Sequence, residues 1–456
     1  MSRGTFAEID LAALQHNLKQ IRHFASQQQV YAMVKADAYG HGLLNVAQAL
    51  SAAGVDGFGV AFLEEGLALR RAGIRERIIL LEGCYNHEES IQASEHHLDI
   101  VVHHFAQIEQ LIQQLLPQSL AVWLKIDTGM HRLGFLPEDV HAAWEHLSTL
   151  ASVRDINLLT HFASSDEVNN PSTLQQLECF NEITNGLPGL RCLANSAAVI
   201  AWPQAHNDVV RPGIMLYGVS PFANKIGSEH HLQPVMTLYS ELIAIHHLKA
   251  GAKVGYGGTY TCPQDMSVGV VAIGYGDGYP RHAPNNTPVL INEQRVSLVG
   301  RVSMDMITVD LSNQPHAKVG DPAILWGKNL PVEEIAGLCG TIGYELLTQV
   351  TARVPKRLLN VWYGDELVGI LFQDETGRIG FRYESTWCQH GFAISQQLPL
   401  AIKEYKPDIY KAHQFFANLL PEAGARSHII RVLKIADDDF QLLKAIGGEC
   451  AGASIL

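Results

Sequence analysis

The chain has 456 residues, of which 47% are hydrophobic and 17% charged, and its formal net charge is −13. This composition is globular, and the length suits two or three domains. The acidic balance argues against a nucleic acid or an anionic membrane as partner.

The seven cysteines are scattered and form no C-x-x-C pair, which is typical of reduced thiols in a cytosolic protein. No apolar signal segment follows Met1, and no run of 18 apolar residues predicts a membrane span. We therefore expect a cytoplasmic location. The 22 histidines include four doublets, whose side chains would point apart on a strand, so no metal site is expected.

Alternating strands and helices dominate the first half of the chain. Asp10, followed by apolar residues at helical spacing, predicts an N-capped helix. Helical segments such as 43–52 and 64–72 separate eight β-rich runs. These runs are 30–35, 57–61, 77–83, 98–104, 121–129, 157–163, 192–198 and 208–218. Eight such units in about 230 residues predict a TIM (β/α)8 barrel. An open doubly wound sheet is the alternative, but the chain lacks its Gly-rich first turn.

Polar residues follow several of these strands. Lys35, Lys125 to Arg132, His161, Asn195-Ser196 and Arg211 all lie near predicted strand ends. The carboxyl ends of barrel strands form one face, where active sites lie. Lys35 ends an apolar run, and burial could lower its pKa enough to make its amine nucleophilic towards an aldehyde. Taken alone, such a lysine is usually an ordinary surface residue.

From about residue 233 the helical spacers become rare. Strands are predicted at 235–247, 268–274, 287–292, 296–302, 307–311 and 323–327. Tyr256 and Tyr275 are each flanked by glycines, which permit close approach of a ligand or of another backbone segment, or form a simple turn. We expect domains at 1–232 (TIM barrel), 233–357 (mostly β) and 358–456 (small α+β module). In the last, a hairpin at 359–372, a strand at 378–382 and helices at 409–419 and 439–446 are predicted.

Six collinear motifs in residues 1–357 resemble the bacterial alanine racemases, fold-type III enzymes that use pyridoxal 5'-phosphate (PLP). The motifs are VKADAYGHG from Val34, KIDTGMHRLG from Lys125, RPGI from Arg211, VGYGGT from Val254, GYGDGY from Gly274 and GRVSMD from Gly300. Two related barrel families match less well: the PLP-homeostasis proteins lack a β domain, and the basic amino-acid decarboxylases lack the Tyr256 motif.

The resemblance implies two catalytic residues. Lys35 would bind PLP covalently and act as the base on one face of the substrate α-carbon, and Tyr256 would act on the other. Racemisation requires proton exchange on both faces of the α-carbon, and one group cannot easily reach both faces, so two bases are expected. A free phenol has a pKa of about 10, so Tyr256 would need help, for which His161 and Arg211 are the family's candidates. Arg211 would also face the pyridine nitrogen and keep it uncharged, which weakens the electron sink and disfavours transamination.

The resemblance also assigns supporting roles. Cofactor binding, mostly through the phosphate, is implied for Tyr39, His161, Ser196, Arg211, Gly213, Ile214 and Tyr344. Arg132 would contact the substrate carboxylate, and the Met304 backbone would contact the substrate. Lys125 matches a lysine that is carbamylated in some members, and Tyr275, Asp305 and Tyr344 match entryway residues. In the family, Tyr256 and Met304 reach the other subunit's site, which implies a head-to-tail homodimer.

Residues 358–456 are similar to the N-terminal subdomain of HipA-type toxin kinases. The resemblance rests on 359–369, Phe381-Arg382-Tyr383, 395–400, 415–422 and 446–453. We expect the kinase core that normally follows to be absent, and therefore no kinase activity. Two interpretations of this segment stay open: a binding or regulatory module, with a separate HipA-like kinase core as a possible partner, and a passive remnant of a gene fusion. The leading interpretation is racemisation of alanine for peptidoglycan. A broad-specificity amino-acid racemase and a toxin–antitoxin interaction protein remain alternatives.

Overall fold

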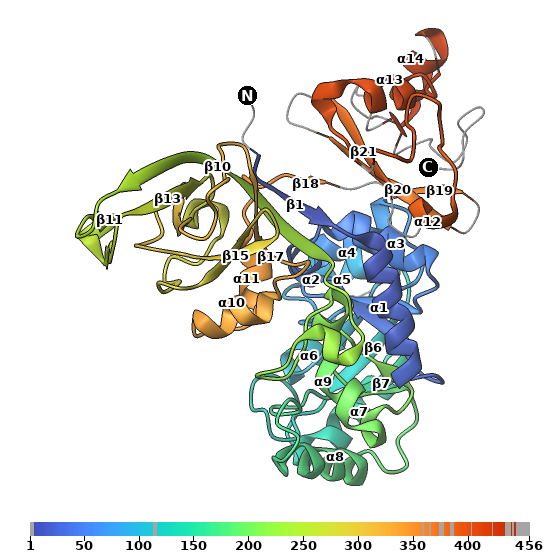
Figure 1. Cartoon of the computed structure of the whole chain (residues 1–456). Coiled ribbons are helices and arrows are strands. Elements are labelled where there is room, and N and C mark those ends of the chain that lie inside the picture. The colour runs from blue at the N-terminus through green and yellow to red at the C-terminus, as the bar shows by residue number, and fades with distance from the viewer. Residues whose placement is uncertain are drawn as a thin grey trace.

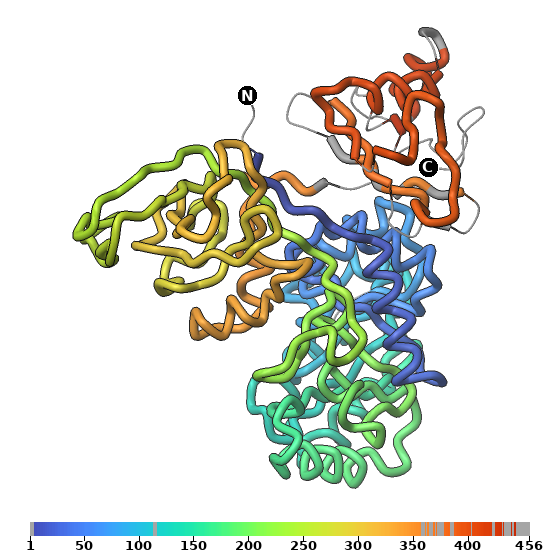
Figure 2. The backbone as a smooth tube through the Cα atoms, in the orientation of Figure 1, coloured from blue at the N-terminus to red at the C-terminus, as the bar shows by residue number. Residues whose placement is uncertain are grey.

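The structure is a computed structural model, and it describes residues 4–112, 116–357, 360–363, 366–373, 378–383, 387–402, 404–421, 423–433, 439 and 442–443. Three parts follow one another along the chain: a helix-covered barrel, a part rich in strands, and a small C-terminal module (Figure 1). The backbone trace shows the barrel in blue to green, the strand-rich part in green to orange and the module in red (Figure 2).

The first part is a closed barrel of eight parallel strands, which confirms the predicted TIM barrel. The strands are β2 (Gln29–Met33), β3 (Gly57–Val60), β4 (Arg77–Leu80), β5 (Asp99–Val102), β6 (Leu120–Lys125), β7 (Val153–Leu159), β8 (Arg191–Cys192) and β9 (Val209–Val210). Every residue of β3, β5 and β6 is buried, as expected for strands covered by helices outside and by side chains inside.

The last two barrel strands are shorter than predicted. The predicted strand at 192–198 is wrong beyond Cys192, because residues Ser196–Ala201 form helix α9, whose N-cap Asn195 accepts a hydrogen bond from the Ala198 N–H at 3.0 Å. Similarly, the predicted strand at 208–218 gives way to a 3-10 helix at Ile214–Tyr217. Apolar runs of this length do not distinguish a strand from a buried helical turn.

Helices surround the barrel in the expected alternation. They are α1 (Leu11–Phe24), α2 (Lys35–Gly40), α3 (Leu43–Ala52), α4 (Leu63–Arg71), α5 (His87–Glu95), α6 (Phe105–Ile112), α7 (Val140–Ser148), α8 (Ser172–Ile183) and α9. The predicted cap of the first helix is confirmed, since Asp10 accepts a hydrogen bond from the Ala13 N–H at 2.9 Å.

The second part is built mainly on antiparallel strands, as predicted. They are β10 (Met236–Leu248), β11 (Lys253–Val254), β12 (Tyr260–Thr261), β13 (Met266–Val271), β14 (Pro288–Ile291), β15 (Gln294–Ser297), β16 (Ile307–Asp310) and β17 (Pro322–Trp326), followed by helices α10 (Val332–Leu338) and α11 (Gly343–Gln349). Strand β1 (Phe6–Ile9) pairs with β10 and with β18 (Lys356–Arg357), so the first strand of the chain completes this sheet.

The barrel and the strand-rich part share one continuous hydrophobic core. The C-terminal module has its own core, which includes Phe381, Tyr383, Trp387 and Phe416. Its elements are β19 (Asn360–Tyr363), β20 (Glu366–Gln373), β21 (Ile379–Tyr383), α12 (Trp387–His390), β22 (Glu404–Tyr405), α13 (Lys411–Ala417) and α14 (Ala423–Leu433). Most of the helix predicted at 439–446, and the motif at 446–453, lie outside the described residues.

Strand β18 connects the strand-rich part to the module. It pairs with β1 in parallel, and the Lys356 ammonium forms an ion pair with Asp37, which follows the first barrel strand. The last residues before the module therefore stabilise the barrel. Among the described residues, no helix has the length and apolarity needed to cross a bilayer.

We expect the barrel and the strand-rich part to fold without the C-terminal module. We expect β18, in contrast, to contribute to their stability. A chain ending at Arg357 should unfold thermally much like the main part of the full protein. A chain ending at Pro355 loses β18 and the Lys356–Asp37 pair, and should unfold at a lower temperature, by roughly 2–4 °C per kcal/mol lost. Circular dichroism melting of both chains measures this, and equal midpoints would contradict it.

Candidate active site

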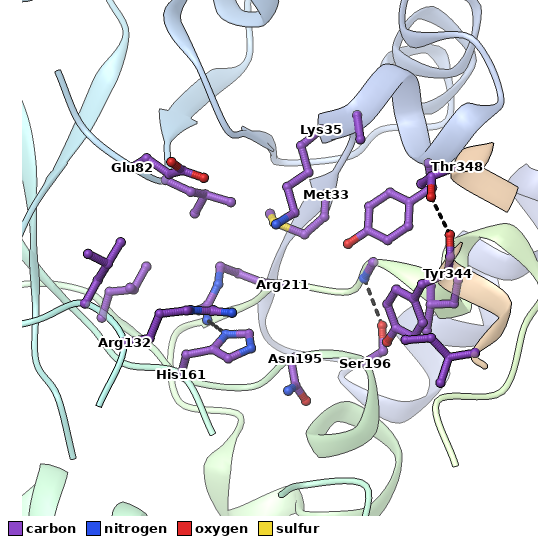
Figure 3. A pocket seen from close by; sticks show the side chains of 18 of the residues that line it. Met33, Lys35, Glu82, Arg132, His161, Asn195, Ser196, Arg211, Tyr344 and Thr348 are labelled. Carbon is purple, nitrogen blue, oxygen red and sulfur yellow. Dashed lines mark hydrogen bonds between the residues drawn. The ribbon is translucent and has the colours of Figure 1, made fainter. Parts of the chain in front are cut away.

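A cavity of about 850 Å³ opens at the carboxyl ends of the barrel strands. Ten of the predicted site residues line it: Lys35, Tyr39, Lys125, Arg132, His161, Ser196, Arg211, Gly213, Ile214 and Tyr344. Figure 3 shows the Lys35 amine pointing towards the centre, above Arg211 and His161, with Ser196 and Tyr344 at one end and Glu82 and Arg132 at the other. The expectation that strand ends converge is confirmed for these residues.

Lys35 begins a left-handed turn directly after β2. The next four residues, Ala36 to Tyr39, have φ between 52° and 54°. Left-handed backbone costs roughly 1–2 kcal/mol per non-glycine residue, so the turn must be stabilised by its surroundings. The Ala36 N–H donates to the Glu65 carboxylate at 2.7 Å, and the Leu43 N–H donates to Asp37 at 2.7 Å.

An aromatic stack fixes the end of this turn. The Tyr39 ring lies 4.9 Å from Tyr217, which also stacks on buried His41 at 4.5 Å. Burial lowers the pKa of His41 to about 4, so this imidazole is neutral. Burial also raises the pKa of Tyr39 to about 12, so the phenol that reaches the cavity keeps its proton.

Arg211 lies at the bottom of the cavity, directly after β9. Its guanidinium donates to the carbonyls of Thr160 at 2.9 Å and Cys192 at 3.1 Å. It also lies 3.3 Å from Nδ1 of His161. Burial, and then the Arg211 charge, hold the pKa of His161 far below its usual value. A guanidinium can only donate, so we assign Nδ1 as acceptor and place the proton of the neutral ring on Nε2.

Positive charge is concentrated around the two lysines of the cavity. Burial, Arg211 and Arg132 lower the pKa of Lys125 to about 8. Burial and Arg132 also lower the pKa of Lys35, partly opposed by Glu82. A larger neutral-amine fraction favours nucleophilic attack on a carbonyl, and the surrounding cations favour an anionic ligand.

The opposite end of the cavity presents hydroxyl and backbone groups. The Ser196 hydroxyl accepts the Gly213 N–H at 2.8 Å. A Cβ atom at Gly213 would lie 2.6 Å from the Tyr39 hydroxyl, so only glycine leaves this space open. Tyr344, on α11, brings a second phenol from the strand-rich part, which therefore forms one wall. Polar donors at a glycine-rich turn suit a phosphate group.

Four predicted site residues lie outside this cavity: Tyr256, Tyr275, Met304 and Asp305. Tyr256 is 67% exposed and Met304 52% exposed, both in the strand-rich part. The Tyr275 N–H donates to the Ser303 carbonyl at 3.1 Å, which places Tyr275 beside Met304, and Asp305 pairs with Arg353 at 2.6 Å. Within one chain, therefore, none of these four residues lines the cavity that contains Lys35.

Other residues at the site have no counterpart in the predicted set. Glu82 lines the cavity two residues after β4, so the strand-end rule could have found it. Ile342, Glu345 and Thr348 line it from α11 and the residue before it, and no sequence signal pointed to them. Buried Gln176 donates to Thr128 at 3.2 Å and to the His161 carbonyl at 3.1 Å, and thus joins the loops that follow β6 and β7.

Comparison with known families divides the chain at similar places. Residues 9–221 match the model of the alanine racemase N-terminal domain, and residues 235–358 match the alanine racemase C-terminal domain. Residues 359–455 match the HipA N-terminal domain. The chain is 53% identical over 349 residues to the alanine racemase of Shewanella baltica strain OS195, covering 76% of this chain and 97% of that protein.

Solved structures agree in fold and in sequence. The biosynthetic alanine racemase from Pseudomonas aeruginosa superposes with a TM-score of 0.76 at 48% identity, covering 78% of this chain and 99% of that one. The alanine racemase from Acinetobacter baumannii gives 0.73 at 42% identity, with the same coverage of 78% and 99%. Together with the strand-end cavity around Lys35, these matches show that the chain belongs to the alanine racemase family.

Proposed function

We propose that the protein interconverts L-alanine and D-alanine with PLP by a two-base mechanism. The observation that carries this is the cavity in which the Lys35 amine meets a fixed cation, Arg211, at the carboxyl ends of the barrel strands. Its volume of about 850 Å³, lined by both the barrel and the strand-rich part, suits a cofactor and a small amino acid together. We also propose the domain limits 1–232, 233–357 and 358–456.

The residues present fit PLP. Lys35 would hold it covalently, and Arg211 would donate to the pyridine nitrogen and leave it uncharged. The space kept open by Gly213, with the hydroxyls of Tyr39, Ser196 and Tyr344 and the backbone of Ile214, would take the phosphate. When bound, PLP supplies the electron sink that weakens the bond between the substrate α-carbon and its hydrogen.

Lys35 and Tyr256 would handle protons on opposite faces of the α-carbon. The lowered pKa of Lys35 favours its neutral form, which can accept a proton. Tyr39 and Tyr344 are poor candidates for the second base, because burial raises the pKa of each phenol. The phenol of Tyr256 is exposed in its own chain, so to act as a base it must face the cavity of another chain. There the Arg211 cation and the neutral imidazole of His161 would assist its proton transfer.

This requirement supports a head-to-tail homodimer with shared active sites. The strand-rich part of one chain would bring Tyr256 and the Met304 backbone to the cavity of its partner. Their exposure is what residues reserved for such an interface should show. Tyr275, Asp305 and Tyr344 would then border the entrance, and the two-fold arrangement would build two equal sites.

The substrate is proposed to be a small amino acid. Arg132 would bind its carboxylate, since a guanidinium is suited to that geometry. Lys125 lies among the same cations, and carbamylation of its amine would convert one positive charge to a negative one beside Arg132. A broad-specificity racemase is the close alternative, and rates with alanine, serine and lysine would distinguish the two.

We propose a cytoplasmic role in supplying D-alanine for peptidoglycan. The C-terminal module is proposed as a binding module for a separate HipA-like kinase core, with a toxin–antitoxin interaction protein as the alternative overall function. A pull-down of the full chain with such a core tests this role. The module carries no residue of the described cavity lining.

Lys35→Ala should abolish covalent cofactor binding and nearly all racemisation, because the amine is both anchor and base. Lys125→Ala is the matched control, since it removes the other lysine of the cavity but should leave the cofactor attached. Borohydride reduction followed by peptide mapping locates the label. Cofactor attached to Lys125 in the wild-type protein would contradict the assignment.

Tyr256→Phe should leave cofactor binding intact and slow racemisation by about 10²–10⁴-fold, the usual contribution of a general acid–base group. Exchange of the α-hydrogen of L-alanine with deuterated solvent measures the step directly. Tyr275→Phe is a control in the same part of the chain, with a much smaller expected effect. Tyr256 is assigned to the α-hydrogen of L-alanine and Lys35 to that of D-alanine, so a loss of exchange confined to D-alanine would reverse the assignment of the two bases.

Mixing the two inactive variants tests the shared site. A mixed dimer of Lys35→Ala and Tyr256→Phe chains has one site with both residues intact, so random exchange of subunits should restore about a quarter of wild-type activity. No recovery, despite subunit exchange shown by mass spectrometry, would place Tyr256 in its own chain's site.

Arg211→Glu should slow racemisation and increase transamination to pyruvate, because a carboxylate would let the pyridine nitrogen keep a proton and strengthen the electron sink. Arg211→Lys retains the cation and is the control for lost contacts with Thr160 and Cys192. Pyruvate formed per racemisation event is the measurement, and an unchanged ratio in Arg211→Glu would count against the uncharged ring.

A further inference from the structure

The sheet of the C-terminal module has two different faces. Along β21, Phe381 and Tyr383 are buried in the module's own core. Successive side chains of a strand point to opposite faces, so Arg382 lies on the face away from that core. Its cross-strand neighbour on this face is Glu404 of β22, at 4.0 Å.

Arg382 contacts the racemase part rather than only its own module. Its guanidinium forms an ion pair with Glu8 of β1, and its charge acts on the Tyr239 phenol of β10, whose pKa it lowers against the larger effect of burial. The Glu8 side chain is only 7% exposed and that of Arg382 is 27% exposed. The pair is therefore largely removed from water.

Glu8 has a second, weaker partner. The Lys328 ammonium lies 3.7 Å from Glu8 and 3.2 Å from Asp10, and its side chain is 43% exposed. Arg382 is thus the close cation for a buried carboxylate, and loss of one member of such a pair leaves an uncompensated charge that is strongly unfavourable.

The path of the chain also favours this contact. Strand β18 pairs with β1 so that Glu8 lies opposite Arg357, the last racemase residue before the module. Only residues 358–359 separate β18 from β19, the first strand of the module, so the module begins close to Glu8. A short tether gives a high effective concentration, so even a small interface can keep the two parts together.

We propose that the Arg382 face of the module is a docking surface whose partner is the chain's own racemase part, at strands β1 and β10. The Arg382–Glu8 pair holds the module in one position instead of leaving it on a loose tether. Another protein that binds the module must use a different surface or compete with Glu8.

Three variants of the full-length chain test this pair: Glu8→Met, Arg382→Met and the double variant. Hydroxyl-radical labelling of Tyr239, read by mass spectrometry, reports how far the module shields that ring, and small-angle scattering reports the extension of the particle. Each single variant leaves one buried charge, so Tyr239 labelling should rise severalfold and the particle should extend. The double variant removes both charges, and apolar replacement of a buried pair is often neutral or stabilising, so labelling should return close to the wild-type rate.

Lys406→Met, which removes an exposed cation of the module, is the matched control and should label like the wild type. Glu8 and Arg382 lie on different parts, so misfolding of one part would not affect both single variants alike, and the racemase rate checks the fold of each. Wild-type labelling in both single variants would overturn the proposal. A double variant that labels as the product of the two single effects would overturn the direct pairing.

Discussion

The guanidinium of Arg211 is the interaction on which the rest of the site depends. It is fixed by the carbonyls of Thr160 and Cys192, and an arginine does not lose its proton in a protein. The neighbouring groups must therefore adjust to a constant charge. The pKa values of Lys35, Lys125 and His161 are all lowered, with burial as the first cause and Arg211 among the charges. An anionic ligand would relieve this excess of positive charge, and its binding would stabilise the folded protein.

The left-handed turn after Lys35 shows how such a site is supported from a distance. Four consecutive residues occupy a backbone region that would be unfavourable in an isolated peptide. Their stabilising contacts come from three places: Glu65 on α4, the stack of Tyr39 on Tyr217, and Lys356 on β18. The position of the lysine amine is therefore set by barrel helices and by the strand-rich part together. One hydrophobic core also spans both parts.

Much of the barrel could be predicted because its signal is local. Apolar runs bounded by helical segments, with Lys35, Lys125 and Arg211 at strand ends, follow directly from parallel topology. The predicted lengths of strands β8 and β9 were too great, because a buried helical turn such as 196–201 is as apolar as a strand. Strand β1 could not be predicted, since it pairs with β10 more than 200 positions away. Of the cavity wall formed by α11 and the residue before it, Tyr344 was predicted from the family resemblance, whereas Ile342, Glu345 and Thr348 were not. Most of the recognised site residues lie in a quoted motif or at a predicted strand end. Glu82 was missed although it follows β4 by two residues. Gln176, which hydrogen-bonds to Thr128 and His161, has no sequence signature.

The C-terminal module contacts the racemase part outside the cavity. Among the described residues, the cavity lining ends at Thr348, before β18 begins. The module meets the racemase at Glu8, on the strand that pairs with β18, and β18 carries Lys356 to the turn after Lys35. The docking contact at Glu8 on β1 and the Lys356–Asp37 pair on β18 therefore lie on two strands that pair with each other. Strand β18 is held at both of its residues, by its pairing with β1 and by the Lys356–Asp37 ion pair. Because β18 links the module to the turn after Lys35, strain from a partner bound to the module would reach Lys35 first through this strand.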